Sequence, residues 1–237
     1  MIVDFIKHWF GTCYDHLGKL ILVNLLLFIC TFPLIFINFL SFLSHNILFL
    51  LFTLSLTIII ISPLFSAISV LISTFGGDFK FRIMDLLILI KKHFLKSIIS
   101  SFIYVLAFDI LAVSFLFYSS GIIPEGLKTP ALFASAISFC VLILLALSSI
   151  YIFPIIVFED KRIFESIKRA VVFMLDNFIF TVFVFLSLIG INLTLFFTGV
   201  GIMVFMFSFT AVGFNTAYFM LDEKYKKIIA IKNKNDN

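Results

Sequence analysis

Charged residues are scarce in this chain of 237 residues, where Asp, Glu, Lys and Arg together make up 13% of the sequence. A soluble domain carries about 25% charged residues, so this chain has too few to cover a folded globule with polar surface. Disorder is excluded for the opposite reason. Disordered chains are poor in apolar residues, whereas 62% of this chain is hydrophobic and 35 residues are phenylalanine. We therefore expect an integral membrane protein.

Cysteine is rare as well, and the sequence carries none of the common catalytic motifs. The three cysteines are an odd number and no pair has C-x-x-C spacing, so neither a disulfide framework nor a zinc site is expected. No Walker A loop, G-x-S-x-G elbow, H-E-x-x-H motif or Rossmann fingerprint occurs. We expect no metal, no cofactor and no enzymatic activity.

Long runs without charge set the expected number of membrane crossings. Residues 20–77 contain no Asp, Glu, Lys or Arg. As one helix they would extend about 87 Å, nearly three times the ~30 Å hydrocarbon core, so we predict a turn at the polar segment 41–46. The uncharged residues 177–221 predict a second hairpin, with its turn at 198–201. The whole pattern predicts an all-α membrane bundle in one domain, 1–221, followed by a short basic tail, 222–237. Its six expected spans are 20–40, 47–73, 97–119, 131–156, 178–197 and 201–221.

The distribution of basic residues orients this bundle. With six spans, alternate loops carry 16 Lys and Arg residues on one side and 1 on the other. Basic loops stay in the cytoplasm, so both termini are expected there. The first span is read as an uncleaved anchor, because its apolar run is too long for a signal peptide and no cleavage site follows promptly. The same bias explains the basic inner face without a nucleic-acid partner.

Three amphipathic segments are expected on the cytoplasmic side, at 2–17, 79–96 and 163–176. Each suits a helix in the membrane interface whose basic side faces anionic lipid. Because each amphipathic segment leads into a pair of spans, we interpret the three units as repeats. The alternative is that a multi-span protein shows this alternation by chance. The basic residues assigned to lipid headgroups are Lys80, Arg82, Lys91, Lys92, Lys96, Lys168 and Arg169.

Small residues recur at helical spacing in two of the spans. They allow close approach of helices and hydrogen bonds between them, and the alternative is that they line a hinge or a cavity. The residues in these two stripes are Ser62, Ser66, Ser69 and Ser73 in the second span, and Gly213 and Ala217 in the sixth.

Asp109 is the acidic residue expected at mid-membrane depth, about twelve residues into the third span. A carboxylate in lipid is costly, so its side chain should face the bundle interior. Two interpretations stay open. Asp109 is a proton- or cation-coupling site, with Tyr151 and Asn192 as further intramembrane candidates, or it is a neutral carboxyl hydrogen-bonded to Tyr151, Asn192 or Ser138.

Several stretches resemble the YesL-type bacterial membrane proteins, a family classed as a domain of unknown function. The stretches that carry the resemblance are Asn24–Leu27 with Pro33, Ser62–Ile68 followed by Leu86–Lys96, Tyr151–Pro154 followed by Ile167–Ala170 and Asp176–Phe178, and Asn215–Tyr218. The chain departs from the family pattern between about 38 and 60, where its outer turn region is longer. The alternation of an inner helix with a pair of spans also resembles, more weakly, the membrane domains attached to glycerophosphodiester phosphodiesterases. The YesL-type resemblance implies a bacterial inner-membrane protein without enzymatic activity, often encoded beside carbohydrate uptake systems.

Two functions follow from these features. The first is an accessory or regulatory partner of a membrane permease or sensor for a solute such as a carbohydrate. The second is a small secondary transporter or channel in which Asp109 couples movement of a proton or cation. The sequence leaves the oligomeric state open.

Overall fold

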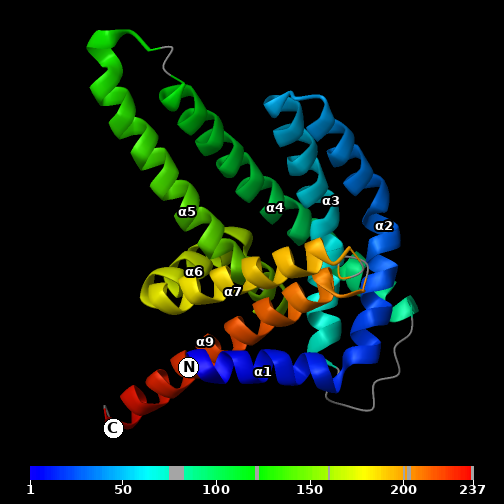
Figure 1. Ribbon diagram of the computed structural model, residues 1–237. Coiled ribbons are helices and arrows are strands. Elements are labelled where there is room, and N and C mark those ends of the chain that lie inside the picture. Colours follow the sequence, from blue (N-terminus) through cyan, green and yellow to red (C-terminus); the bar gives the residue numbers. More distant parts are fainter. Residues whose placement is uncertain (75–82, 121–122, 160, 200, 202–203, 236–237) are drawn as a thin grey trace.

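The described residues of the computed structural model are 1–74, 83–120, 123–159, 161–199, 201 and 204–235, and within them the fold is all-helical, as predicted. Figure 1 shows the arrangement. The elements are α1 (Ile2–Asp15), α2 (Leu17–Leu43), α3 (Ile47–Ser73), α4 (Ile83–Ser119), the short 3-10 helix η1 (Glu125–Leu127), α5 (Lys128–Phe158), α6 (Ile163–Asp176), α7 (Phe178–Phe197) and α9 (Met206–Asn235).

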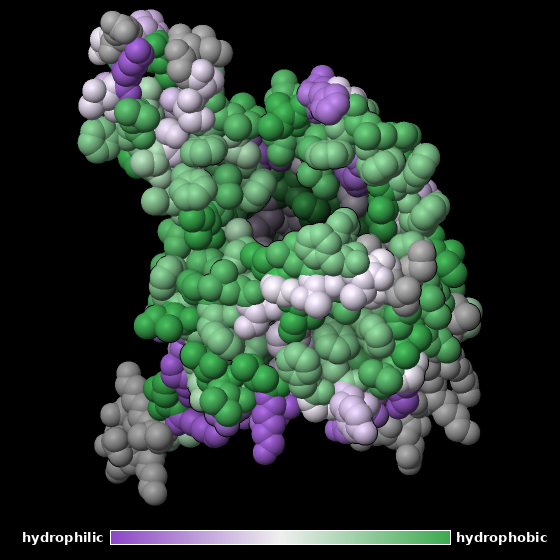
Figure 2. All heavy atoms as spheres, in the orientation of Figure 1, coloured by the Kyte–Doolittle hydropathy of each residue, from purple (hydrophilic) through white to green (hydrophobic). Residues whose placement is uncertain are grey.

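Five helices in the described residues are long and apolar enough to cross a membrane, namely α2, α3, α4, α5 and α7. Figure 2 shows a broad hydrophobic surface over the bundle, with hydrophilic residues towards its two ends. Large apolar side chains point outward from several of these helices, including Ile29, Phe52 and Phe197, which are 72%, 64% and 83% exposed. Such a surface suits contact with lipid and not with water.

The sixth expected span, 201–221, is not among these five helices. Helix α9 begins at Met206 and meets its first charged residue at Asp222, so its uncharged part extends only about 24 Å at 1.5 Å per residue. In Figure 1, α7 and the first half of α9 lie across the direction of α2 to α5. Their adjoining ends also lie well below the α2–α3 and α4–α5 connections. A count of six spans is therefore not confirmed.

Two of the three expected interfacial helices are separate elements. Helices α1 and α6 are short and amphipathic, close to the predicted 2–17 and 163–176. The described part of the segment predicted at 79–96 instead continues without a break into the third span as α4. Helix α4 contains neither glycine nor proline, so nothing in its sequence ends a helix between the interface and the membrane. The threefold repeat is not confirmed.

The predicted turn at 41–46 is present and has a local cause. His45 has a φ of 54°, and Asn46 caps α3 by accepting hydrogen bonds from the backbone N–H groups of Leu48 and Phe49. Further along the hairpin, Asn38 Nδ2 donates to Thr57 Oγ1 at 2.7 Å. This hydrogen bond between α2 and α3 helps to fix the register of the pair.

The serine stripe of α3 lies mostly at helix contacts. Ser62, Ser66 and Ser69 are fully buried, whereas Ser73 is exposed at the end of the helix. Ser97 of α4 donates to Ser66 Oγ at 2.7 Å. Asn215 of α9 donates to the Ser69 carbonyl at 2.7 Å. Three of the four serines therefore face neighbouring helices.

Helix α1 is attached to α9 through the single tryptophan of the chain. Trp9 is 1% exposed, and its indole N–H donates to the Phe209 carbonyl at 3.0 Å. Gly213 leaves the space that the indole ring occupies. A Cβ at Gly213 would lie 3.1 Å from Trp9 Cε2 and 2.8 Å from Leu188 Cδ2, so a larger residue would displace α1 or α7.

We predict that Gly213→Val destabilises the protein by about 1–3 kcal/mol more than Gly190→Val, because overpacking costs about that much. Gly190 lies in α7, is exposed, and has open space around its missing Cβ. Both variants place the same β-branched residue in a helix, so the difference reports the contact with Trp9 and Leu188. Thermal unfolding of both purified variants in detergent measures it, and equal melting temperatures would contradict the packing at Gly213.

Candidate functional site

A cavity of about 470 Å³ lies between α3, α4 and α5, with Phe214 of α9 at its edge. Figure 2 shows a hollow in the hydrophobic surface over this part of the bundle. Most of its lining residues are aliphatic or aromatic, and Asp109 is the one charged residue among those described. This volume falls in the range of small-molecule sites.

Asp109 is half-buried and contacts α3 across this cavity. Ser55 Oγ lies 2.9 Å from Oδ1 and 2.7 Å from Oδ2 of the carboxylate. The two residues meet because α3 begins and α4 ends at the same end of the bundle. Ser55 lies eight residues after the start of α3 and Asp109 ten residues before the end of α4, which corresponds to about 12 and 15 Å of helix.

The hydrogen-bond partners predicted for Asp109 are wrong. Tyr151 is fully buried and its hydroxyl pairs with Thr181 Oγ1 at 2.8 Å. Asn192 exchanges hydrogen bonds with Thr210 at 3.0 and 3.1 Å. In the part of the chain that the structure describes, Ser138 is not among the partners of Asp109 either. Tyr151 and Asn192 each find a hydroxyl partner in another helix instead.

Asn192 nevertheless lies close to the site, in a neighbouring cavity of about 350 Å³ between α5, α7 and α9. Ser149 and Phe214 line both this cavity and the one that holds Asp109. The Phe214 ring also packs edge-on against Phe65, at 5.4 Å between ring centroids. Phe214 therefore forms part of the wall between two cavities with polar groups.

The end of the bundle where α5 meets α6 holds a network of ion pairs that the sequence does not predict. Arg169 of α6 binds the carboxylate of Glu159 and lies 3.5 Å from Asp222 of α9. Glu159 is 9% exposed and also lies 2.6 Å from the Lys161 ammonium. Tyr218 donates to Glu159 Oε1 at 3.2 Å. Arg169 therefore joins α6 to α9 and to the end of α5, where a lipid headgroup was expected.

A second part of this network involves the start of the tail. Tyr225 donates to the Asp176 carboxylate at 2.6 Å and its ring stacks on Phe173 at 5.0 Å. Burial raises the pKa of Tyr225, and its hydrogen bond to Asp176 raises the pKa further. Lys226 lies 2.7 Å from Asp222, and this contact raises the pKa of the ammonium.

The remaining residues assigned to headgroups fall into two groups. Lys91, Lys92 and Lys168 are exposed, and Lys96 is half-buried. Lys80 and Arg82 lie outside the described residues. Exposed lysines beside an apolar surface suit contact with anionic headgroups.

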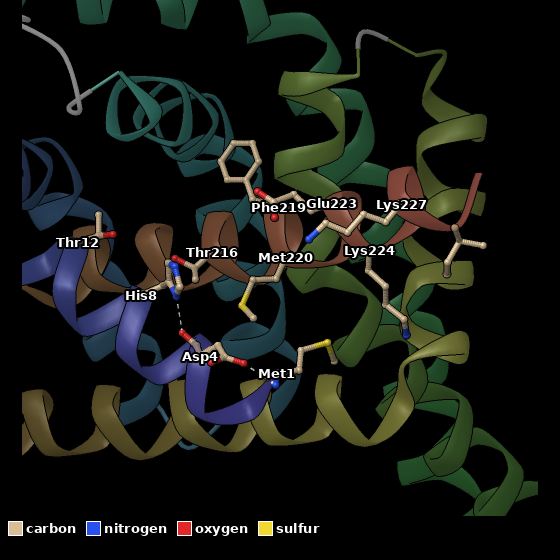
Figure 3. A pocket seen from close by; sticks show the side chains of 11 residues that line it. Met1, Asp4, His8, Thr12, Thr216, Phe219, Met220, Glu223, Lys224 and Lys227 are labelled. Carbon is tan, nitrogen blue, oxygen red and sulfur yellow. Dashed lines mark hydrogen bonds and ion pairs between the residues drawn. The ribbon is translucent and has the colours of Figure 1, made fainter. Parts of the chain in front are cut away.

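A third hollow, a groove of about 660 Å³, separates α1 from the C-terminal part of α9. Figure 3 shows His8 and Thr12 of α1 facing Thr216 and Met220 of α9 across it. Some of its polar groups already have partners. His8 Nδ1 lies 2.8 Å from the Asp4 carbonyl, and Lys224 donates to Asn177 at 2.6 Å. Within the described residues, no three His, Cys, Asp or Glu side chains are placed to hold a metal ion.

In comparisons with known proteins, no family model, no curated protein and no solved structure matches the chain. The resemblance to YesL-type proteins therefore stays a prediction. The cavity around Asp109 has to be interpreted from its own geometry.

We predict that Arg169→Ala lowers the free energy of unfolding by about 1.5–3 kcal/mol, the usual worth of hydrogen bonds to charged groups. Lys168→Ala, one residue away and exposed, should change it by less than about 0.5 kcal/mol. Denaturant unfolding of both variants in mixed micelles measures the difference. Equal effects would show that Arg169 contributes no more than an exposed lysine.

Proposed function

We propose that this chain is a small membrane transporter or channel in which Asp109 couples the passage of a proton or cation. The observation that carries this proposal is a lone carboxylate in a cavity between apolar helices. Keeping an ionisable group at this depth costs free energy, and such groups commonly mark ion or substrate pathways. The hydrogen bond to Ser55 does not by itself need a charge, because an asparagine of the same shape would also accept it.

The chemistry of this site follows from its two states. When Asp109 is ionised, it attracts a cation in a surrounding of low dielectric, where the attraction is strong. Ser55 can pair with either form of the group, because its hydroxyl donates to a carboxylate and accepts from a carboxyl group. Under this proposal, exchange of a bound cation for a proton at Asp109 is the coupling step.

We further propose that both termini lie in the cytoplasm of a bacterial cell and that α7 and α9 form the third pair of crossings in its inner membrane. The course of the chain supports this arrangement. In Figure 1, α1 and the C-terminal part of α9 lie side by side at the end of the bundle opposite the α2–α3 and α4–α5 connections. Termini at one end require an even number of crossings. That end also carries most of the basic residues.

An accessory role beside a permease or sensor is the second candidate, and the groove between α1 and α9 favours it. The groove combines apolar residues such as Phe219 and Met220 with Asp4 and Glu223. This composition suits an amphipathic segment of a partner at the inner face. The partner would belong to a solute-uptake system, as the YesL-type resemblance implies.

We predict that vesicles containing only this protein show solute- or ion-dependent proton movement, and that Asp109→Asn reduces its rate at least tenfold. A pH-sensitive dye inside the vesicles reports the movement across a panel of cations, amines and sugars. Asp85→Asn is the matched control, since Asp85 lies in the first turn of the same helix and away from the cavity. No flux for the whole panel would contradict transport and favour the accessory role.

We predict that cysteines at Ser44 and Thr198 react with an impermeant maleimide added outside spheroplasts, whereas a cysteine at Glu165 reacts only after lysis. All three positions are exposed at ends or connections of helices. The native Cys13, Cys30 and Cys140 are first replaced by alanine. Outside labelling at Ser44 without labelling at Thr198 would mean that α7 and α9 enter the membrane without crossing it.

A further inference from the structure

The hydroxyl groups around Asp109 leave one buried polar atom without a partner. Five residues with hydroxyls line the cavity, and four of them are engaged: Ser55 with Asp109, Ser101 with the Ser97 carbonyl, Tyr104 with Ser148, and Ser149 with the Ala146 carbonyl. Ser100 is 1% exposed, and its Oγ has no hydrogen-bond partner in the described part of the chain. This Oγ is enclosed by protein atoms, so the carboxylate of Asp109, and not Ser100, selects what the cavity binds.

The carboxylate itself is also incompletely paired. A carboxylate has about four acceptor sites, and a serine hydroxyl has one proton to donate. Ser55 lies within reach of both oxygens but supplies only that one proton. Among the described lining residues no Lys, Arg or His provides a second partner. An ionised Asp109 therefore needs a positive charge from the occupant.

The size and walls of the cavity decide which cation fits. Mg²⁺ and Ca²⁺ take six or more oxygen ligands, whereas one carboxylate and a few engaged hydroxyls face this space. A volume of about 470 Å³ is far larger than a bare ion needs. Phe108, Phe153 and Phe214 are among the lining residues, and aromatic rings attract organic cations. The cavity therefore suits an organic cation that has an apolar part and one positively charged group.

We propose that this cavity is a binding site for an organic monocation, an amine or quaternary ammonium on an apolar body, whose charged group pairs with Asp109. This inference rests on the proposed function, because it names the class of substrate for the same carboxylate.

The test is equilibrium binding of radiolabelled (3-phenylpropyl)trimethylammonium to the purified full chain in detergent, by scintillation proximity. This probe keeps its charge at every pH. We expect saturable binding that Asp109→Asn weakens at least tenfold, Asp109→Glu partly retains and Asp85→Asn leaves unchanged. The uncharged 3-phenylpropanol should compete at least tenfold more weakly than the unlabelled cation. Equal binding by wild type and Asp109→Asn, or equal competition by the alcohol, would overturn the proposal. The melting temperature of each variant checks that it is folded.

Binding and transport can fail separately. Cation binding without proton movement in vesicles would support the assigned site and overturn the transport function. Proton movement that depends on Asp109, with no cation binding, would support transport and overturn the substrate class.

Discussion

The absence of water in a hydrocarbon core is the constraint on which this structure depends. Every polar group at that depth has to find its partner within the chain, which is why the spans are helices. The side chains obey the same rule. Asn38 bonds to Thr57, Asn192 to Thr210 and Tyr151 to Thr181, and each of these pairs joins two helices. Such pairs fix which helices touch in a bundle whose apolar surfaces are otherwise interchangeable.

The same constraint explains how the start of α9 is held. The first backbone N–H groups of a helix have no partner inside that helix. Asn24 of α2 is fully buried, and its Oδ1 accepts a hydrogen bond from the backbone N–H of Ser208 at 2.9 Å. Seven residues later, Asn215 donates to the Ser69 carbonyl. Helix α9 is thereby tied to α2 and α3 through two asparagines.

The sequence predicts features that depend on local residues and misses those that depend on packing. The turn at 41–46, the first five candidate spans and the amphipathic helices α1 and α6 follow from charge-free runs, caps and amphipathic periodicity. The partner of Asp109 does not, because many hydroxyls share its depth and only the contact of α3 with α4 selects Ser55. The network around Arg169 was missed for the same reason. Its partners come from α5 and α9, and a basic residue on an amphipathic helix suits lipid equally well.

Helix α9 connects the two regions on which the functional proposals rest. Its Phe209 carbonyl accepts from Trp9 of α1, and Gly213 leaves room for that indole. The next residue, Phe214, lines the cavity of Asp109 and also that of Asn192. About one and a half turns of α9 thus carry both the contact with α1 and part of the wall between two cavities. Since packed helices shift as rigid units, a displacement of α9 relative to α5 moves both together. The accessory and transport hypotheses therefore concern one connected structure, because a partner bound between α1 and α9 would act on the same helix that borders the carboxylate.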